Sequence, residues 1–138
     1  PSPNRIGCVQ VGNVVFVSGH GRDLPAGVKS EGAGKVGAEV TIEEAIISAE
    51  AVALSILASL KQHCGGDLDR VKRVVRIFGM VNSAPDFELQ PRVIDGASDL
   101  FYELFAAEYG QHARSAVGMA ALPHRIPVEI NGEFEVWD

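Results

Sequence analysis

Two short apolar runs near the start of the chain, residues 8–11 and 14–17, are separated by a Gly-Asn pair. Turn-favouring residues between two valine-rich runs are typical of a β-hairpin. The segment S-G-H-G at 18–21 follows directly, and we expect a turn there. Its glycines would also let a ligand come close to backbone N–H groups, so a ligand-binding role stays open.

A long amphipathic helix is the strongest pattern in the sequence. T-I-E-E at 41–44 forms a capping box, in which the threonine hydroxyl and the last glutamate each accept a hydrogen bond from the other's backbone. Apolar residues then recur at helical spacing until the Gly65-Gly66 pair, which favours a helix end. The glycine-rich segment 22–39 before it predicts an exposed loop, with room for one short strand near 35–36.

The second half of the chain alternates β-rich and helical patterns. Residues 70–81 predict a basic strand, more typical of a solvated sheet edge than of an anion site. The S-x-x-D motif at 83–86 predicts the start of a helical region, which Pro91 interrupts. We therefore expect a short turn and then a second helix from about Arg92 to Glu108, with Gly110 as its stop. Two further strands are expected, Ala113 to Ala121 and Pro127 to Glu135.

This order of elements predicts a single α+β domain over residues 1–138. Its architecture would be a two-layer sandwich, with two helices on one face of a mixed sheet. An apolar fraction of 46% with 22% charged residues is ordinary for a soluble globular protein.

Charge and cysteine content narrow the functional classes. A formal net charge of −6 makes nucleic-acid binding an unfavoured prediction, although local basic patches remain possible. The two cysteines, Cys8 and Cys64, lack metal-ligand spacing, so we expect no metal and a reducing, cytoplasmic location. No apolar run is long enough for a membrane span.

Arg114 and Glu129 are lone charges among apolar strand residues, which makes both candidate site residues. Burying such a charge without a partner costs on the order of several kcal/mol. If the last two strands formed a simple hairpin, Arg114 would lie opposite Phe134, roughly 17 Å from Glu129 at ~3.3 Å per residue. A shared site would then need another strand pairing or a second copy of the chain.

Four motifs resemble the RidA/YjgF family of reactive-intermediate deaminases. They are V-S-G at 17–19, H-A-R-S-A-V at 112–117, A-L-P at 121–123 and V-E-I at 128–130. The resemblance implies a chorismate-mutase-like fold and a homotrimer whose clefts lie between subunits. It implies hydrolysis of a small 2-imino acid, or its enamine tautomer, to a 2-keto acid and ammonia, with no cofactor.

Residue roles follow from the same resemblance. Arg114 would hold the substrate carboxylate as a bidentate ion pair, and Glu129 would position or activate the attacking water. Ser18 and Gly19 would form a wall of the cleft.

Three cleft positions depart from the family pattern, which places the chain in a divergent branch. The tyrosine usual near the first strand is missing, with Arg5 and Ile6 in its neighbourhood. His20 stands where the family has glutamine and is a candidate acid, base or donor, and Ser98 stands where asparagine is common. His112 and His124 flank strands and are expected to be solvated.

Two other functions compete with deamination. Members of this family are also credited with endoribonuclease activity or inhibition of translation, which the acidic net charge of this chain opposes. The third possibility is a protein that binds small carboxylates without catalysis. In that case Arg114 would bind ligand, and substitution of Glu129 would change nothing.

Overall fold

The computed structural model describes residues 3–22 and 33–138. Its strands form one mixed sheet. Its strands are β1 (Cys8–Val11), β2 (Val14–His20), β3 (Val71–Asn82), β4 (Ala113–Met119) and β5 (Val128–Val136). They lie in the order β1-β2-β5-β3-β4, with β3 and β4 parallel and the other neighbouring pairs antiparallel.

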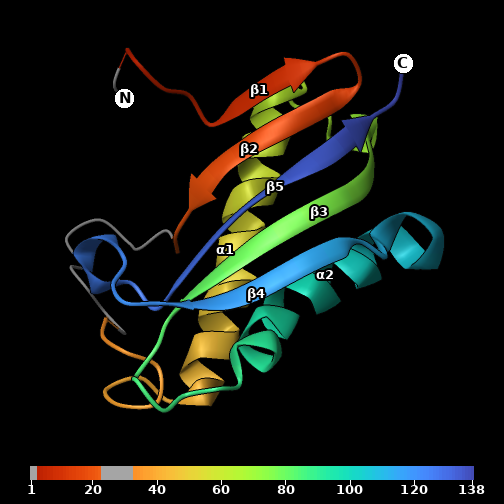
Figure 1. Cartoon of the computed structure of the whole chain (residues 1–138). Helices are drawn as coiled ribbons and strands as arrows, with labels where there is room; N and C mark the ends of the chain where they lie inside the picture. The colour runs from red at the N-terminus through yellow and green to blue at the C-terminus, as the bar shows by residue number, and fades with distance from the viewer. Residues whose placement is uncertain (1–2, 23–32) are drawn as a thin grey trace.

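Two long helices cover one face of the sheet. They are α1 (Ile42–His63) and α2 (Gln90–Gly110), and both lie behind the sheet in Figure 1. Two short 3-10 helices lie in the connections: η1 (Leu68–Arg70) between α1 and β3, and η2 (Pro123–Arg125) between β4 and β5. The core lies between the layers, where side chains such as Ile56, Phe101 and Phe134 are fully buried. The two-layer α+β prediction is confirmed.

The first hairpin and the first helix form as the sequence predicts. Gly12 takes a left-handed conformation, with φ of 60°, in the turn between β1 and β2. The Thr41 side chain accepts a hydrogen bond from the Glu44 amide at 3.1 Å, and the Glu44 carboxylate accepts one from the Thr41 amide at 3.0 Å. The capping box is therefore confirmed.

The predicted turn at 18–21 is wrong over most of its length. Ser18, Gly19 and His20 belong to β2, and the register against β5 shifts between Val17 and His20. A bulge of this kind keeps the strand paired while it re-aims side chains, which a turn prediction from glycine content misses.

The predicted helix start at 83–86 is also wrong. The Ser83 hydroxyl donates to the Val81 carbonyl at 2.9 Å instead of capping a helix. The helix α2 begins at Gln90, and Pro91 lies in its first turn. A proline there loses no helical hydrogen bond, so Pro91 starts this helix rather than interrupting it.

One prediction about strand neighbours needs correction, and the structure answers one pairing question that the sequence left open. The basic strand β3 is not a sheet edge, because it lies between β5 and β4. The last two strands do not pair with each other, since β3 separates them. The predicted loop at 22–39 lies mostly outside the described residues, and single bridges at Val36 replace the short strand expected there.

The alternation of side chains assigns residues to the two faces of the sheet. Val128 and Ile130 are buried beneath the helices, so Glu129 between them points to the open face that α1 and α2 leave uncovered. Across the described residues, neither helix is long and apolar enough to cross a membrane.

Candidate functional site

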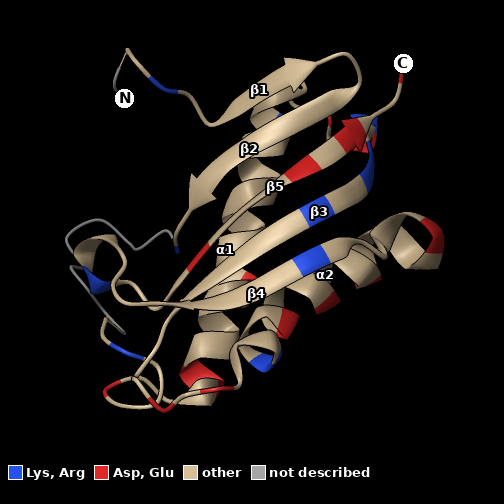
Figure 2. Ribbon diagram, in the orientation of Figure 1, with Lys and Arg blue, Asp and Glu red and all other residues tan. Residues whose placement is uncertain are grey.

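Arg114 faces the helix layer from the edge strand of the sheet. It pairs with Ile77, whose side chain is buried beneath the helices, and it is the basic band on β4 in Figure 2. Its Nη1 donates to Asp95 Oδ1 at 2.7 Å and to Ser98 Oγ at 3.1 Å, and both partners lie on α2. The Arg114 side chain is 25% exposed, so it is held in place but open to a ligand.

His112 completes this cluster and is not solvated as predicted. Its ring is half-buried, with Nδ1 2.6 Å from the Gly110 carbonyl and Nε2 3.0 Å from Ser98 Oγ. The ring also meets Phe101 edge-on, with 6.3 Å between ring centroids. His124, by contrast, is exposed as expected.

The cluster lies at a cavity of about 400 Å³ between α2 and the start of β4. Its charged lining residues are Asp95, Asp99 and Arg114. The arrangement can receive a small polar ligand, because a fixed guanidinium offers planar, directional donors for carboxylate or carbonyl oxygens.

Glu129 lies on the other face of the sheet. It pairs with Met80 in β3, and its side chain is half-buried on the open face. A Cβ added to Gly19 would collide with the Glu129 carboxylate. The structure therefore brings Gly19 and Glu129 together, but it places Glu129 and Arg114 on opposite faces.

Ser18 and His20 are engaged in contacts of their own. The Ser18 hydroxyl donates to the Ile6 carbonyl at 2.7 Å. His20 pairs with buried Ile130 and so faces the helices, with Nδ1 2.6 Å from the Ser18 carbonyl and Nε2 2.7 Å from Ser59 Oγ in α1. Neither the His20 ring nor the Ser18 hydroxyl reaches Arg114 or Glu129 by a described contact.

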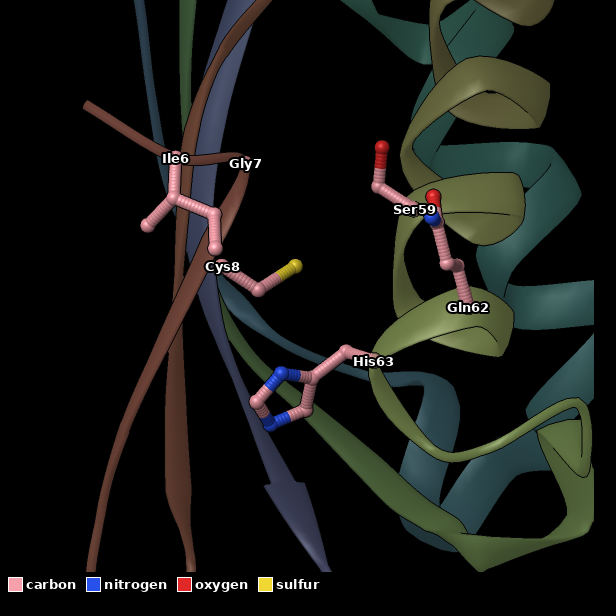
Figure 3. Close-up of a pocket in the computed structure, with 6 residues that line it drawn as sticks. All are labelled: Ile6, Gly7, Cys8, Ser59, Gln62 and His63. Atoms are coloured by element: carbon pink, nitrogen blue, oxygen red, sulfur yellow. The ribbon is translucent and has the colours of Figure 1, made fainter. Parts of the chain in front are cut away.

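A second cavity, of about 260 Å³, lies between β1 and α1 (Figure 3). In that view the Cys8 sulfur points toward the helix that carries Ser59 and Gln62. Burial raises the pKa of the Cys8 thiol, and the nearby Cys64 adds to this rise. A thiol kept protonated is a poor nucleophile, so this cavity offers little chemistry beside the Arg114 cluster.

Sequence reasoning missed Asp95 and His112. Asp95 and Ser98 are three residues apart on a helix, a spacing that places both on one face and could have indicated a joint partner. Nothing local could indicate that His112 meets them, because that contact depends on how β4 packs against α2. Among the described residues, no group of three or more His, Cys, Asp or Glu side chains is placed to hold a metal ion.

Comparison with known proteins places this geometry in a family. The model of the family described as "YjgF/chorismate mutase-like, putative endoribonuclease" matches residues 7–126. Protein TCP17 of Trypanosoma cruzi is 42% identical over 137 residues, which cover 99% of this chain and 83% of that protein.

Two solved structures share the fold over nearly the whole chain. The protein Atu1372 of Agrobacterium tumefaciens, described as of unknown function, superposes with a TM-score of 0.89 at 40% identity and covers 97% of this chain and 83% of its own. A protein of Shewanella oneidensis described as a "putative endoribonuclease" gives 0.88 at 30% identity, covering 96% and 85%. The chain therefore belongs to the YjgF/chorismate mutase-like family.

Proposed function

We propose that this protein hydrolyses small 2-imino acids, or their enamine tautomers, to 2-keto acids and ammonia. The observation that supports this most directly is the fixed and partly exposed Arg114 guanidinium at the cavity. Within the described residues both of its hydrogen bonds leave from Nη1, so Nε and Nη2 are available for a bidentate carboxylate contact.

Glu129 would supply the base from a neighbouring copy of the chain. Because Arg114 and Glu129 lie on opposite faces of one sheet, one copy cannot bring both to the same substrate. We therefore propose a homotrimer whose clefts combine the Arg114 side of one copy with the Glu129 side of the next.

The open face of the sheet suits such an assembly. Phe16, at 49% exposure, is a large apolar residue on this face, and its pairing partner Val9 is 52% exposed. The charges of Arg76 and Glu133 are already paired there, by two hydrogen bonds of 2.8 Å each. Exposed apolar side chains favour burial against another protein, and an ion pair already closed within one copy lowers the electrostatic cost of covering it.

The proposed hydrolysis uses water and the side chains of Glu129 and Arg114. Water attacks the imine carbon while Glu129 accepts its proton, and Glu129 returns this proton to the imine nitrogen to give a carbinolamine. Glu129 then moves the hydroxyl proton of the carbinolamine to the same nitrogen, so that the C–N bond breaks, ammonia leaves and the oxygen becomes the keto oxygen. Arg114 holds the carboxylate throughout and fixes the imine carbon relative to the water. The buried, free thiols of Cys8 and Cys64 are consistent with work in a reducing compartment such as the cytoplasm.

The deciding experiment measures ammonia and keto-acid release from freshly generated 2-iminopropanoate. We expect Arg114→Ala to lower kcat/KM roughly 10- to 100-fold, the loss of one charged hydrogen-bonded contact, and Glu129→Gln to lower kcat. Arg125→Ala is the matched control, because this arginine also pairs with a carboxylate, Glu39, at 2.8 Å but lines neither cavity described above.

Full turnover in a folded Arg114→Ala variant would refute the assignment. If Arg114→Ala abolishes binding of a keto acid while no wild-type turnover occurs, the protein is a carboxylate binder without catalysis.

Cleavage of RNA is the second candidate, because the family description and the Shewanella oneidensis protein carry that activity in their names. A net charge of −6 opposes it. RNA binding that weakens steeply with added salt would favour this candidate over deamination.

A further inference from the structure

The hydrogen bonds of His112 fix which of its nitrogens carries the proton. A backbone carbonyl can only accept, so Nδ1, 2.6 Å from the Gly110 oxygen, must be the donor. In the neutral ring Nε2 is then an acceptor, and the Ser98 hydroxyl at 3.0 Å must donate to it. The Ser98 hydrogen therefore points at a base.

Arg114 adds a positive charge to the same oxygen. Its Nη1 donates to Ser98 Oγ at 3.1 Å, and Asp95 holds that nitrogen from the other side at 2.7 Å. A hydroxyl that donates to an imidazole and accepts from a guanidinium is stabilised as it loses its proton. These are the relations that define a serine nucleophile and its base, with a backbone carbonyl orienting the histidine.

We propose that Ser98 and His112 form a nucleophile–base pair that cleaves small carboxylic esters at the Arg114 cavity. Ser98, His112 and Arg114 all line this cavity, so an ester can reach the hydroxyl. The free edge of Arg114 would hold the developing oxyanion, as it would hold a carboxylate in the proposed deamination. Among the lining residues the two carboxylates of Asp95 and Asp99 outnumber the one guanidinium. This excess of negative charge repels esters that carry several negative charges and favours neutral esters.

The backbone that presents the Gly110 carbonyl is strained. Ala106 interrupts α2 with φ of 63° and ψ of 179°, a region that residues other than glycine rarely occupy. The chain then turns so that Gly110 passes against Tyr102, where a Cβ would lie 2.8 Å from the Tyr102 Cα. This turn aims the carbonyl at His112, and the edge-on contact with Phe101 fixes the ring plane.

The reaction balances with water as the only co-reactant. Ser98 Oγ bonds to the ester carbonyl carbon as its proton passes to His112 Nε2, and the carbonyl electron pair moves onto the oxygen facing Arg114. Collapse of this intermediate breaks the bond to the alcohol, which leaves with the proton from His112. Water then attacks the acyl-serine while His112 takes its proton, and the proton returns to Ser98 as the carboxylic acid leaves.

The test uses p-nitrophenyl acetate as the ester, with the intact protein. We expect p-nitrophenol release together with an acetyl adduct on the peptide that contains Ser98. Ser98→Ala should lose the adduct and lower the release rate at least 100-fold, and His112→Gln should lower acylation on the order of 10²-fold, a common size for loss of a general base. Ser115→Ala is the matched control, because Ser115 is exposed on the open face of β4, one residue from Arg114.

An adduct elsewhere in the chain, or p-nitrophenol release that survives in Ser98→Ala, would overturn the proposal, as would a folded wild type that is never acylated. A purely structural Ser98 could affect stability but would carry no adduct. The 2-iminopropanoate assay on the same samples is independent: ester cleavage without deamination removes the proposed function and leaves this inference standing, and the reverse result does the opposite.

Discussion

The close contact between α1 and α2 at Gly96 can be tested by the substitution Gly96→Ala. A Cβ at Gly96 would collide with the Ile46 carbonyl oxygen in α1, with the carbonyl carbon at 3.1 Å and the Ala49 Cβ at 3.2 Å. The obstruction is backbone, which cannot rotate away, so the helices must separate.

The magnitude follows from two opposing effects. Overpacking costs about 1–3 kcal/mol, and a rigid backbone obstruction belongs near the upper end. Replacing a helical glycine by alanine returns up to about 1 kcal/mol. We expect a net loss of about 2 kcal/mol. With an unfolding entropy of about 2.1 cal/mol/K per residue over 138 residues, this lowers Tm by about 7 °C.

Calorimetry or urea unfolding measures this difference. Gly7→Ala is the matched control, since a Cβ there meets nothing nearer than Ser59 Oγ at 3.8 Å, and we expect a change within about 1 kcal/mol. A Gly96→Ala protein that is as stable as the wild type would refute the close helix contact.

Three further predictions follow from single contacts. Ala106→Gly should raise the free energy of unfolding by about 1 kcal/mol in urea, because glycine removes the strain at φ of 63°. The Thr41 backbone and side-chain hydrogen bonds lower the pKa of Glu44, so their stabilisation is present above about pH 4.5 and is lost as the pH falls through the lowered folded pKa. Glu44→Gln should therefore be less stable than wild type at pH 7, with a gap that narrows toward pH 3 in urea titrations. Gly19→Ala should lower kcat for 2-iminopropanoate while leaving Tm nearly unchanged, because the new methyl displaces the mobile end of the Glu129 side chain.

Elements set by local patterns were predictable from the sequence. The capping box at Thr41 and the apolar repeat behind it predicted α1, and the turn at Gly12 predicted the first hairpin. Both depend on residues a few positions apart. Arg114 and Glu129 were site candidates because each is a lone charge among apolar strand residues, and the family motifs then suggested their roles; both the choice and the roles stay predictions.

Features set by distant residues were not predictable in this way. Serine is a common helix-capping residue, but the Ser83 hydroxyl donates a hydrogen bond to the Val81 carbonyl instead of accepting one from a helix amide. The local sequence does not indicate which of these two hydrogen bonds forms. His112 was expected to be solvated because of its place in a loop. Instead it forms a hydrogen bond with Ser98, because β4 packs beside α2. Arg114 and Glu129 lie on strands that β3 separates, so their relative placement follows from the strand order of the sheet. The sequences of β4 and β5 do not encode that order.

The position of β5 has a consequence for how the chain folds during synthesis. It is the last of the described strands in chain order but the middle strand of the sheet, where it lies between the β1-β2 hairpin and the β3-β4 pair. Its partners include Val14, which pairs with Glu135 from the far end of the sequence. Such long-range pairing slows folding, and the strands made earlier stay unpaired along one edge until β5 is available. While the ribosome is still making β5, the emerging chain holds two unjoined half-sheets with open edges, so this interval is when a chaperone is most needed and aggregation is most damaging.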